Sequence, residues 1–285
     1  MKPNLFQSQP IVPGVTRIIG PGFVYAYLVE GREKALLIDT VCGVGDLKGY
    51  VEALTDLPLL VANTHCHGDH VSGNFQFDEV YIHPDDRDAM LREHPADQMD
   101  YVRGEEDARS FPHLWTEADV IEKRPIRAVD MPDGFVFDLG GSTVEVIAVP
   151  GHTRGTVVFL DRERRLMYAG DACNCNTLLI DYDDDLCVPA TVETYRAAMQ
   201  RLYDEYFDKF DRFFVAHGDW DIEKRIIPEM IETCDAILTG RDDAVPGAFL
   251  GMTAFIAGAR DEHFRRCDGK IANILYTKNN IFNPR

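Results

Sequence analysis

The sequence lacks the features that mark membrane-spanning and exported proteins. Its 285 residues contain no run of about 18 apolar residues, so no segment is long enough for a transmembrane helix. Residues 1–7 show no apolar core followed by a cleavage site of small residues, which argues against an export signal. We therefore expect a cytoplasmic protein without a membrane partner.

Basic residues are scarce relative to acidic ones. The 29 lysines and arginines face 48 aspartates and glutamates, and the formal net charge is −19. Nucleic acids bind to clustered positive charge, and an acidic surface slows the approach of any polyanion. The charge balance therefore argues against a nucleic-acid partner and favours a small-molecule substrate.

Paired cysteine motifs are absent as well. No Cys-x-x-Cys occurs, which excludes a zinc knuckle and a thioredoxin-like redox motif. The number of cysteines is odd, and reduced thiols in a reducing compartment are the simplest interpretation. The seven cysteines are Cys42, Cys66, Cys173, Cys175, Cys187, Cys234 and Cys267.

The chain also lacks linkers, internal repeats and low-complexity segments. Apolar residues make up 45% of it, which is enough for a sizeable core. Since α/β folds of this length are commonly one unit, we predict a single domain over residues 1–285. The tail at 241–285 carries no motif; it either completes the fold or forms a homodimer contact.

Apolar periodicity predicts a mixture of strands and helices. Residues 14–39 hold three short apolar bursts separated by turn residues, which indicates an antiparallel meander. Helical spacing of apolar residues predicts amphipathic helices at 44–55, 192–206 and 223–239. The second of these begins after Thr191, a residue type that caps helix N-termini.

Residues 84–124 differ in character from their surroundings. They are charged and rich in helix-forming sequence, and we interpret them as a helical lid over a site. A solvated helical pair with a structural role is the alternative. His94 and His113 lie in this segment without the spacing of metal ligands, so we do not include them in the metal set.

The segment Thr64–His70 reads Thr-His-Cys-His-Gly-Asp-His and places four potential metal ligands within six residues. The apolar stretch at 59–62 predicts a buried strand just before it, and alternate residues at a strand end share a face. His65 and His67 therefore project in one direction, while the final Asp-His pair turns toward a second point. One cation cannot easily use all four groups, so the spacing predicts two adjacent metal ions.

Four further residues complete a recognisable order. Asp39 closes an apolar strand, His152 follows Pro-Gly, Asp171 follows Tyr-Ala-Gly, and His217 precedes a glycine. With the His-x-His-x-Asp-His stretch, this ordered set resembles the metallo-β-lactamase superfamily over most of the chain. The resemblance implies an α+β fold, an αββα sandwich of two mixed β-sheets flanked by helices, with a helical insertion near 84–124.

The resemblance also implies the roles of the ligands. Imidazole and carboxylate groups without thiolate suit zinc, with iron or manganese as alternatives. Asp69 is implied as the catalytic residue that orients the nucleophile and passes its proton to the leaving group. The implied sets are His65, His67 and His152 for the first ion, Asp69, His70 and His217 for the second, and Asp171 between them.

A chain with this resemblance is expected to be an enzyme. The implied reaction is hydrolysis of a small ester, lactone, thioester or amide, in which two zinc ions hold a bridging hydroxide. A small-molecule phosphodiesterase and an iron-dependent redox or dioxygenase member remain alternatives. Asp39 is implied to steady the metal loop. Asn174, Tyr182 and Trp220 are candidates for the substrate pocket, with packing as the alternative role for Tyr182 and Trp220.

Overall fold

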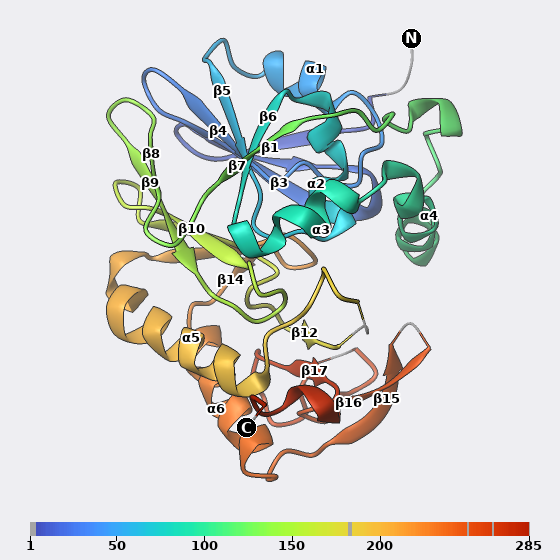
Figure 1. Cartoon of the computed structure of the whole chain (residues 1–285), viewed down its shortest axis with the longest axis vertical. Coiled ribbons are helices and arrows are strands. Elements are labelled where there is room, and N and C mark those ends of the chain that lie inside the picture. The colour runs from blue at the N-terminus through green and yellow to red at the C-terminus, as the bar shows by residue number, and fades with distance from the viewer. Residues whose placement is uncertain (1–3, 182–183, 250, 264, 285) are drawn as a thin grey trace.

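The computed structural model describes residues 4–181, 184–249, 251–263 and 265–284, and its first layer is a seven-stranded sheet (Figure 1). Its first four strands pair antiparallel, and the fourth to seventh pair parallel. Strand β4 is buried along its whole length, as expected for an uninterrupted apolar strand covered on both faces. In spatial order the strands are β1 (Gln7–Val12), β2 (Val15–Ile19), β3 (Tyr25–Glu30), β4 (Ala35–Ile38), β5 (Leu59–Ala62), β6 (Glu79–Ile82) and β7 (Arg127–Asp130).

The second layer is a six-stranded sheet within the described part of the chain. Its strands pair antiparallel except for one parallel pair, β11 with β13. Both sheets are therefore mixed. In spatial order the strands are β14 (Asp221–Ile222), β13 (Arg212–Val215), β11 (Leu166–Gly170), β10 (Val157–Asp161), β9 (Thr143–Ala148) and β8 (Val136–Asp138).

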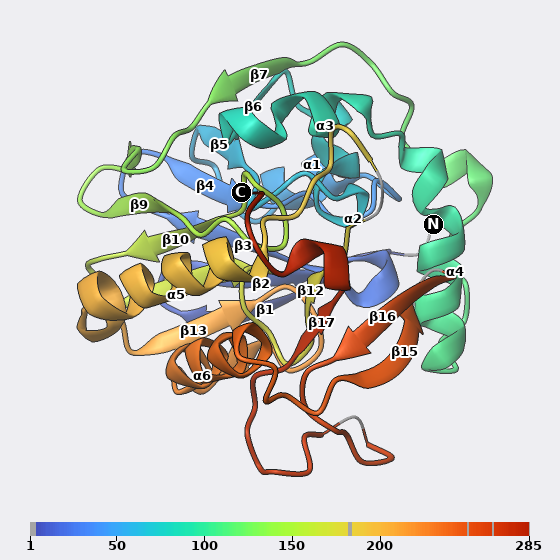
Figure 2. The same cartoon turned by 60° about the horizontal axis from the view of Figure 1, so that its bottom comes forward.

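Apolar side chains fill three successive interfaces around these sheets. Tyr27 and Ile38 of the first sheet pack with Phe159 and Phe214 of the second, which forms the centre of a sandwich. On the outer face of the second sheet lie α5 (Val192–Tyr206) and α6 (Ile226–Leu238), side by side in Figure 2. The outer face of the first sheet packs against α1 (Leu47–Glu52) and part of the insertion. The predicted αββα sandwich is confirmed.

The C-terminal tail adds a feature that the sequence pattern did not predict. A third sheet of four strands lies at one end of the molecule, in the lower part of Figure 1. The segment between Asp171 and His217 contributes one strand, and the tail contributes the other three. In spatial order they are β12 (Thr177–Leu179), β17 (Ile274–Tyr276), β16 (Met252–Ile256) and β15 (Val245–Phe249). The single domain over residues 1–285 stays a prediction. The homodimer contact of the tail stays a prediction as well.

The insertion is helical, as predicted. It contains α3 (Arg87–Arg92) and α4 (Met99–Ala108), joined by short 3-10 turns. No helix among the described residues has both the length and the apolar character needed to cross a bilayer. The remaining short helices are α2 (Gly68–Val71), η1 (Pro21–Phe23), η2 (Ser72–Gln76), η3 (Pro84–Asp86), η4 (Pro95–Gln98), η5 (Glu117–Asp119), η6 (Phe207–Lys209) and η7 (Lys278–Asn280).

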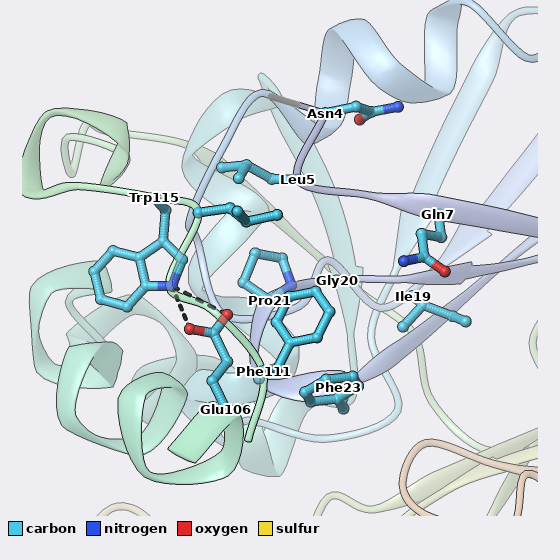
Figure 3. A pocket seen from close by; sticks show the side chains of 12 residues that line it. Asn4, Leu5, Gln7, Ile19, Gly20, Pro21, Phe23, Glu106, Phe111 and Trp115 are labelled. Atoms are coloured by element: carbon cyan, nitrogen blue, oxygen red, sulfur yellow. Dashed lines mark hydrogen bonds between the residues drawn. The ribbon is translucent and has the colours of Figure 1, made fainter. Parts of the chain in front are cut away.

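A buried carboxylate fastens the outer end of the insertion. Glu106 of α4 is 2% exposed and accepts a hydrogen bond from Trp115 Nε1, at 2.9 and 3.1 Å to its two oxygens. Figure 3 shows this pair at the wall of a hollow that is also lined by Pro21 and Phe111. Glu106 Oε2 lies 2.7 Å from His113 Nδ1 as well. The contact explains why His113 is placed here: it partners a structural carboxylate.

The His113 contact predicts a pH dependence of stability. The hydrogen bond to Glu106, with further support from Asp107, raises the pKa of His113 above its ordinary 6.5. The folded protein therefore favours the protonated ring, and this stabilisation is present below pH 6.5 and is lost as the pH rises through the raised pKa. We expect the difference in melting temperature between the parent protein and His113→Gln to shrink from about pH 6 to about pH 9. A difference that stays constant over this range would contradict the assignment.

Candidate metal centre

The segment Thr64–His70 follows the end of β5 and leads into the short helix α2. His67 precedes α2 with extended backbone angles, and the helix turns Asp69 and His70 away from the direction of the first two histidines. Gly68 lies close to the insertion, since a Cβ at this position would lie 2.0 Å from Gln98 Nε2 and the glutamine side chain would have to move. The insertion therefore packs directly against the segment that carries the predicted ligands.

The predicted first ligand set converges in the structure. His65 Nε2 lies 3.1 Å from His67 Nδ1, and His67 Nδ1 lies 2.8 Å from His152 Nε2. His152 follows β9 in the loop that leads to β10. Three ring nitrogens from two distant segments thus point at one position, where they form a group able to hold a cation.

The predicted second set converges beside it. His70 Nε2 lies 3.2 Å from His217 Nε2, and Asp69 Oδ2 lies 3.4 and 3.2 Å from these two nitrogens. His217 follows β13, so it also comes from the second half of the chain. Asp69 is 19% exposed at its side chain, and His70 is fully buried.

Asp171 lies between the two sets. Its Oδ2 atom is 3.4 Å from His217 Nε2 and 3.8 Å from both His70 Nε2 and His152 Nε2. Its Oδ1 atom is buried and has no hydrogen-bond partner. A buried carboxylate oxygen without a partner is unusual, because removing it from water is costly unless something replaces the lost hydrogen bonds.

The outward nitrogens of these histidines have partners of their own. His65 Nδ1 lies 3.0 Å from Thr64 Oγ1, and His152 Nδ1 lies 2.9 Å from the Leu178 carbonyl oxygen of β12. His217 Nδ1 lies 3.5 Å from the Tyr101 hydroxyl of α4. Such outer contacts fix the orientation of a ring and leave its inner nitrogen free to bind a metal.

Asp39 contacts His70 of the second set and the residue that begins the ligand segment. Its Oδ2 lies 3.0 Å from His70 Nδ1, and its two oxygens accept hydrogen bonds from Thr64 N and Thr64 Oγ1, each at 2.8 Å. The residue has a left-handed backbone, with φ at 64°. Aspartate tolerates this conformation better than most residues, because its short polar side chain bonds locally.

Asp86, at the start of the insertion, supports the first set. This carboxylate is 1% exposed and joins both segments that carry first-set ligands. It accepts hydrogen bonds from Cys66 N at 3.0 Å, Thr153 Oγ1 at 2.6 Å and Gly155 N at 2.9 Å. The insertion therefore holds the two ligand loops in register with each other.

The surroundings of the cluster shift the pKa values of its histidines in opposite directions. Burial, with the neighbouring His67, lowers the pKa of His152 to about 4, whereas the carboxylates of Asp171 and Asp69 outweigh burial and raise the pKa of His217 to about 10. Burial works against ionisation of Asp69 and Asp171, but the surrounding histidines, His70 and His217 above all, hold the pKa of both carboxyls below the usual range. The carboxylates thus stay ionised in a buried place and require positive charge next to them.

These observations fit a pair of bound metal ions. The inner atoms are imidazole nitrogens and carboxylate oxygens, which zinc binds readily, and the outer nitrogens are already occupied. The unpartnered Asp171 Oδ1 is the orphaned atom that a cation would satisfy. The three groups of converging atoms are His65, His67 and His152; His65, His70 and Asp171; and Asp69, His70 and His217.

The other predicted pocket residues have different surroundings. Asn174 forms a turn, in which its Oδ1 accepts a hydrogen bond from Asn176 N at 2.9 Å. The Trp220 ring packs on Phe214 and under the Arg17 guanidinium, within the sandwich. Tyr182 lies outside the described residues. A role of Asn174 and Trp220 toward a substrate stays a prediction.

Sequence reasoning missed two residues that contact the site, Asp86 and Tyr101. Both lie in the insertion, which was interpreted as a lid without naming the residues that reach inward. Asp86 is preceded by Pro84 and Asp85, and nothing in this local pattern separates a buried aspartate from an exposed helix cap. Tyr101 lies two residues after the start of α4, on a helix whose inward face is only partly apolar.

A comparison with known families agrees with the fold. The family described as metallo-beta-lactamase superfamily matches residues 19–220, which include every predicted ligand. The chain therefore belongs to the metallo-beta-lactamase superfamily, and the resemblance seen in its sequence is confirmed. A solved metallo-beta-lactamase from Pontibacter korlensis has the same fold, with a TM-score of 0.55 and 17% identity over 81% of this chain and 99% of that one.

Two of the curated relatives that this chain resembles are named as thioesterases. Acyl-coenzyme A thioesterase MBLAC2 of Homo sapiens is 29% identical over 165 residues, which are 54% of this chain and 59% of that protein. Atrochrysone carboxyl ACP thioesterase of Claviceps purpurea is 28% identical over 215 residues, 71% of this chain and 56% of that protein. The chain thus spans less than two thirds of the length of both relatives.

Proposed function

We propose that this protein is a metal-dependent hydrolase of acyl thioesters. The observation that carries the proposal is the convergence of five histidines and two aspartates on two adjacent points, with Asp171 between them. The thioester as the substrate class is supported by the named activities of the curated relatives. The overall reaction adds water to the thioester and yields a carboxylic acid and a free thiol.

Two zinc ions are the cofactor that we propose for this site. Histidine and carboxylate ligands without thiolate favour zinc over softer metals, and a family of hydrolases provides the context. When bound, such a pair supplies a Lewis acid and a nucleophile active at neutral pH. The proposed ligands are His65, His67 and His152 at the first ion, Asp69, His70 and His217 at the second, and Asp171 shared by both.

The protein side chains position water and substrate around that pair. The Asp69 carboxylate is partly exposed at the cluster, so it is the group able to accept a proton from the attacking water and to return it to the departing thiolate. The outer contacts of Asp39, Tyr101 and Leu178 hold the rings in place, so that little reorganisation is needed during the reaction. Burial of His65 and His70 keeps bulk water away from the inner face.

The net charge of the chain predicts how turnover of a substrate with a charged acyl carrier depends on salt. Coenzyme A is a polyanion, and a net charge of −19 repels it at long range. Salt screens this repulsion over roughly 10 Å at 0.1 M ionic strength. If the carrier is acyl-coenzyme A, kcat/KM should therefore rise with added salt, whereas an uncharged acyl-N-acetylcysteamine thioester should show no such rise.

The test of the proposed function combines metal content with substrate turnover. The purified protein is analysed for metals by mass spectrometry and is offered acyl-coenzyme A, an acyl-N-acetylcysteamine, a glutathione thioester, a homoserine lactone, a p-nitrophenyl ester, a chromogenic β-lactam and bis-p-nitrophenyl phosphate. We expect about two zinc ions per chain and turnover of a thioester with kcat/KM at least about 10⁴ M⁻¹s⁻¹, within the usual enzyme range. Turnover of only the phosphodiester, or iron in a coloured protein, would overturn the proposal in favour of phosphodiester hydrolysis or redox chemistry.

A further inference from the structure

Two cysteines from distant parts of the chain meet beside the first ligand set. Cys66 Sγ lies 3.5 Å from Cys187 Sγ, although 121 residues separate them in the sequence. Cys66 stands between His65 and His67 in the ligand segment, and Cys187 lies in the loop between β12 and α5. Both belong to one small apolar cluster, in which Cys66 is 0% and Cys187 is 8% exposed.

Each cysteine is held by contacts of its own main chain. Cys66 N donates to the buried Asp86, as described above. Cys187 N donates to Asp184 Oδ1 at 3.0 Å, and Asp184 forms an ion pair with Arg92 of α3, with contacts of 2.9 and 2.7 Å. Both anchoring carboxylates are thus tied to one short stretch of the insertion, Asp86 within it and Asp184 through Arg92. Through these contacts the two thiols lie next to each other.

The remaining distance is small enough to close. A disulfide has an S–S length of about 2.05 Å, so the two sulfur atoms have to approach by about 1.5 Å. Cys66 is rigidly placed between ligands, whereas the anchor of Cys187 is at the surface, since the Arg92 and Asp184 side chains are 43% and 30% exposed. An exposed ion pair contributes little stability, so a shift of residues 184–187 costs little.

We propose that Cys66 and Cys187 form a redox-active thiol pair that closes to a disulfide beside the first ligand set. With hydrogen peroxide as the oxidant, the Cys187 sulfur attacks one peroxide oxygen and gives a sulfenic acid and one water. The Cys66 thiol then attacks the Cys187 sulfur, the S–S bond forms, and the sulfenic oxygen leaves as a second water. Two thiols and one peroxide thus give one disulfide and two waters.

Closure of this bond affects the site directly. Cys66 is bonded through the peptide chain to His65 and His67, so whatever part of the approach Cys66 makes displaces both rings. Cys187 also contacts the His67 ring, and the disulfide removes that thiol as a partner. Misplacement of catalytic groups by about 1 Å costs up to about 10²-fold in rate. Bond formation is independent of the reaction catalysed, whereas its effect on turnover rests on the proposed function.

The test treats the metal-loaded full-length protein with hydrogen peroxide and maps its cysteines by mass spectrometry after digestion with trypsin without reduction. The expected product links peptide 49–87, in which Cys66 is the sole cysteine, to peptide 166–196, and fragment ions place the bond at Cys187 and not at Cys173 or Cys175. Turnover of the thioester should fall about 10- to 100-fold and recover with dithiothreitol. Release of zinc to a chromophoric chelator is followed in parallel, as a readout that needs no substrate.

Matched variants separate the pair from general oxidation. Cys187→Ser should form no link, and its ratio of treated to untreated turnover should stay near one. Cys267→Ser removes an exposed thiol and should behave like the parent protein. The proposal is overturned if Cys267 of the parent protein is oxidised while no link between 49–87 and 166–196 forms, and its effect on the site is overturned if the link forms without loss of turnover or zinc. If no thioester is turned over at all, the proposed function fails, and the linked peptide and zinc release alone decide on the thiol pair.

Discussion

Replacing Asp171 by alanine is expected to lower kcat/KM for the thioester by at least about 10³-fold, which corresponds to about 4 kcal/mol of lost transition-state stabilisation. The reason is its place between both ligand sets, with Oδ2 within 3.8 Å of His70, His152 and His217. A carboxylate shared by two ions affects both when it is lost, whereas one histidine affects mainly its own site. Metal content should fall from about two ions to about one or fewer per chain.

The measurement for Asp171 pairs mass-spectrometric metal content with steady-state kinetics. Asp171→Asn is the second variant, because it keeps the shape of the side chain and removes its charge, so that a loss of activity is not a loss of fold. Asp56→Ala, an exposed carboxylate elsewhere in the chain, is the control. Circular dichroism spectra should match among the three. An alanine variant with two bound metals and parental turnover would show that Asp171 has no part in the centre.

Replacing Asp86 by asparagine is expected to weaken the first metal site without touching a ligand. The carboxylate accepts hydrogen bonds from Cys66 N, Thr153 Oγ1 and Gly155 N, and an amide in its place turns at least one donor toward another donor. Hydrogen bonds to a charged group contribute about 1.5–3 kcal/mol each, so we expect unfolding free energy to fall by about 2–4 kcal/mol. Loss of such an outer partner also lowers metal affinity by about 10- to 100-fold.

The two metal sites give the Asp86 prediction its internal control. Stepwise titration with zinc against a chromophoric chelator should show a lower zinc affinity at His65, His67 and His152. The zinc affinity of the other site should be unchanged. Asp88→Asn lies two residues further on an exposed face and should change neither. If urea unfolding shows the loss of stability but both zinc affinities stay at their parental values, the predicted effect on the metal site is wrong. Asp86 then has a role in the stability of the fold only.

Local sequence rules predicted much of this molecule. The helix at 192–206 begins where Thr191 predicted it, because its hydroxyl oxygen accepts a hydrogen bond from Thr194 N at 3.1 Å. The ligand segment was equally accessible, since its chemistry lies within a few consecutive residues. The three apolar bursts within 14–39 correspond to β2, β3 and β4, because most of the buried positions in these strands are apolar.

Features built from distant partners were beyond such rules. Strand β12 has three residues, and its parallel pairing with β17 joins positions almost 100 residues apart, for which no local signal exists. Strand β1 is exposed and polar, so it lacks the alternation that marks a half-buried strand. The buried position of Asp86 could not be predicted for the same physical reason. Its three donors come from two remote loops, and only the folded chain brings them to one carboxylate.

The ligands are divided between the two halves of the chain, and this division determines the order in which the two ligand sets can form during synthesis. His152 follows His67 by 85 residues, and His217 follows His70 by 147. At a synthesis rate of roughly 5–20 residues per second, the last ligand leaves the ribosome roughly 7–30 s after the first group is complete. Until His152 emerges, the nascent chain presents three histidines and an aspartate without their later partners. The first ligand set becomes complete before the second, so the order of translation is also the order in which the two halves of the centre are assembled.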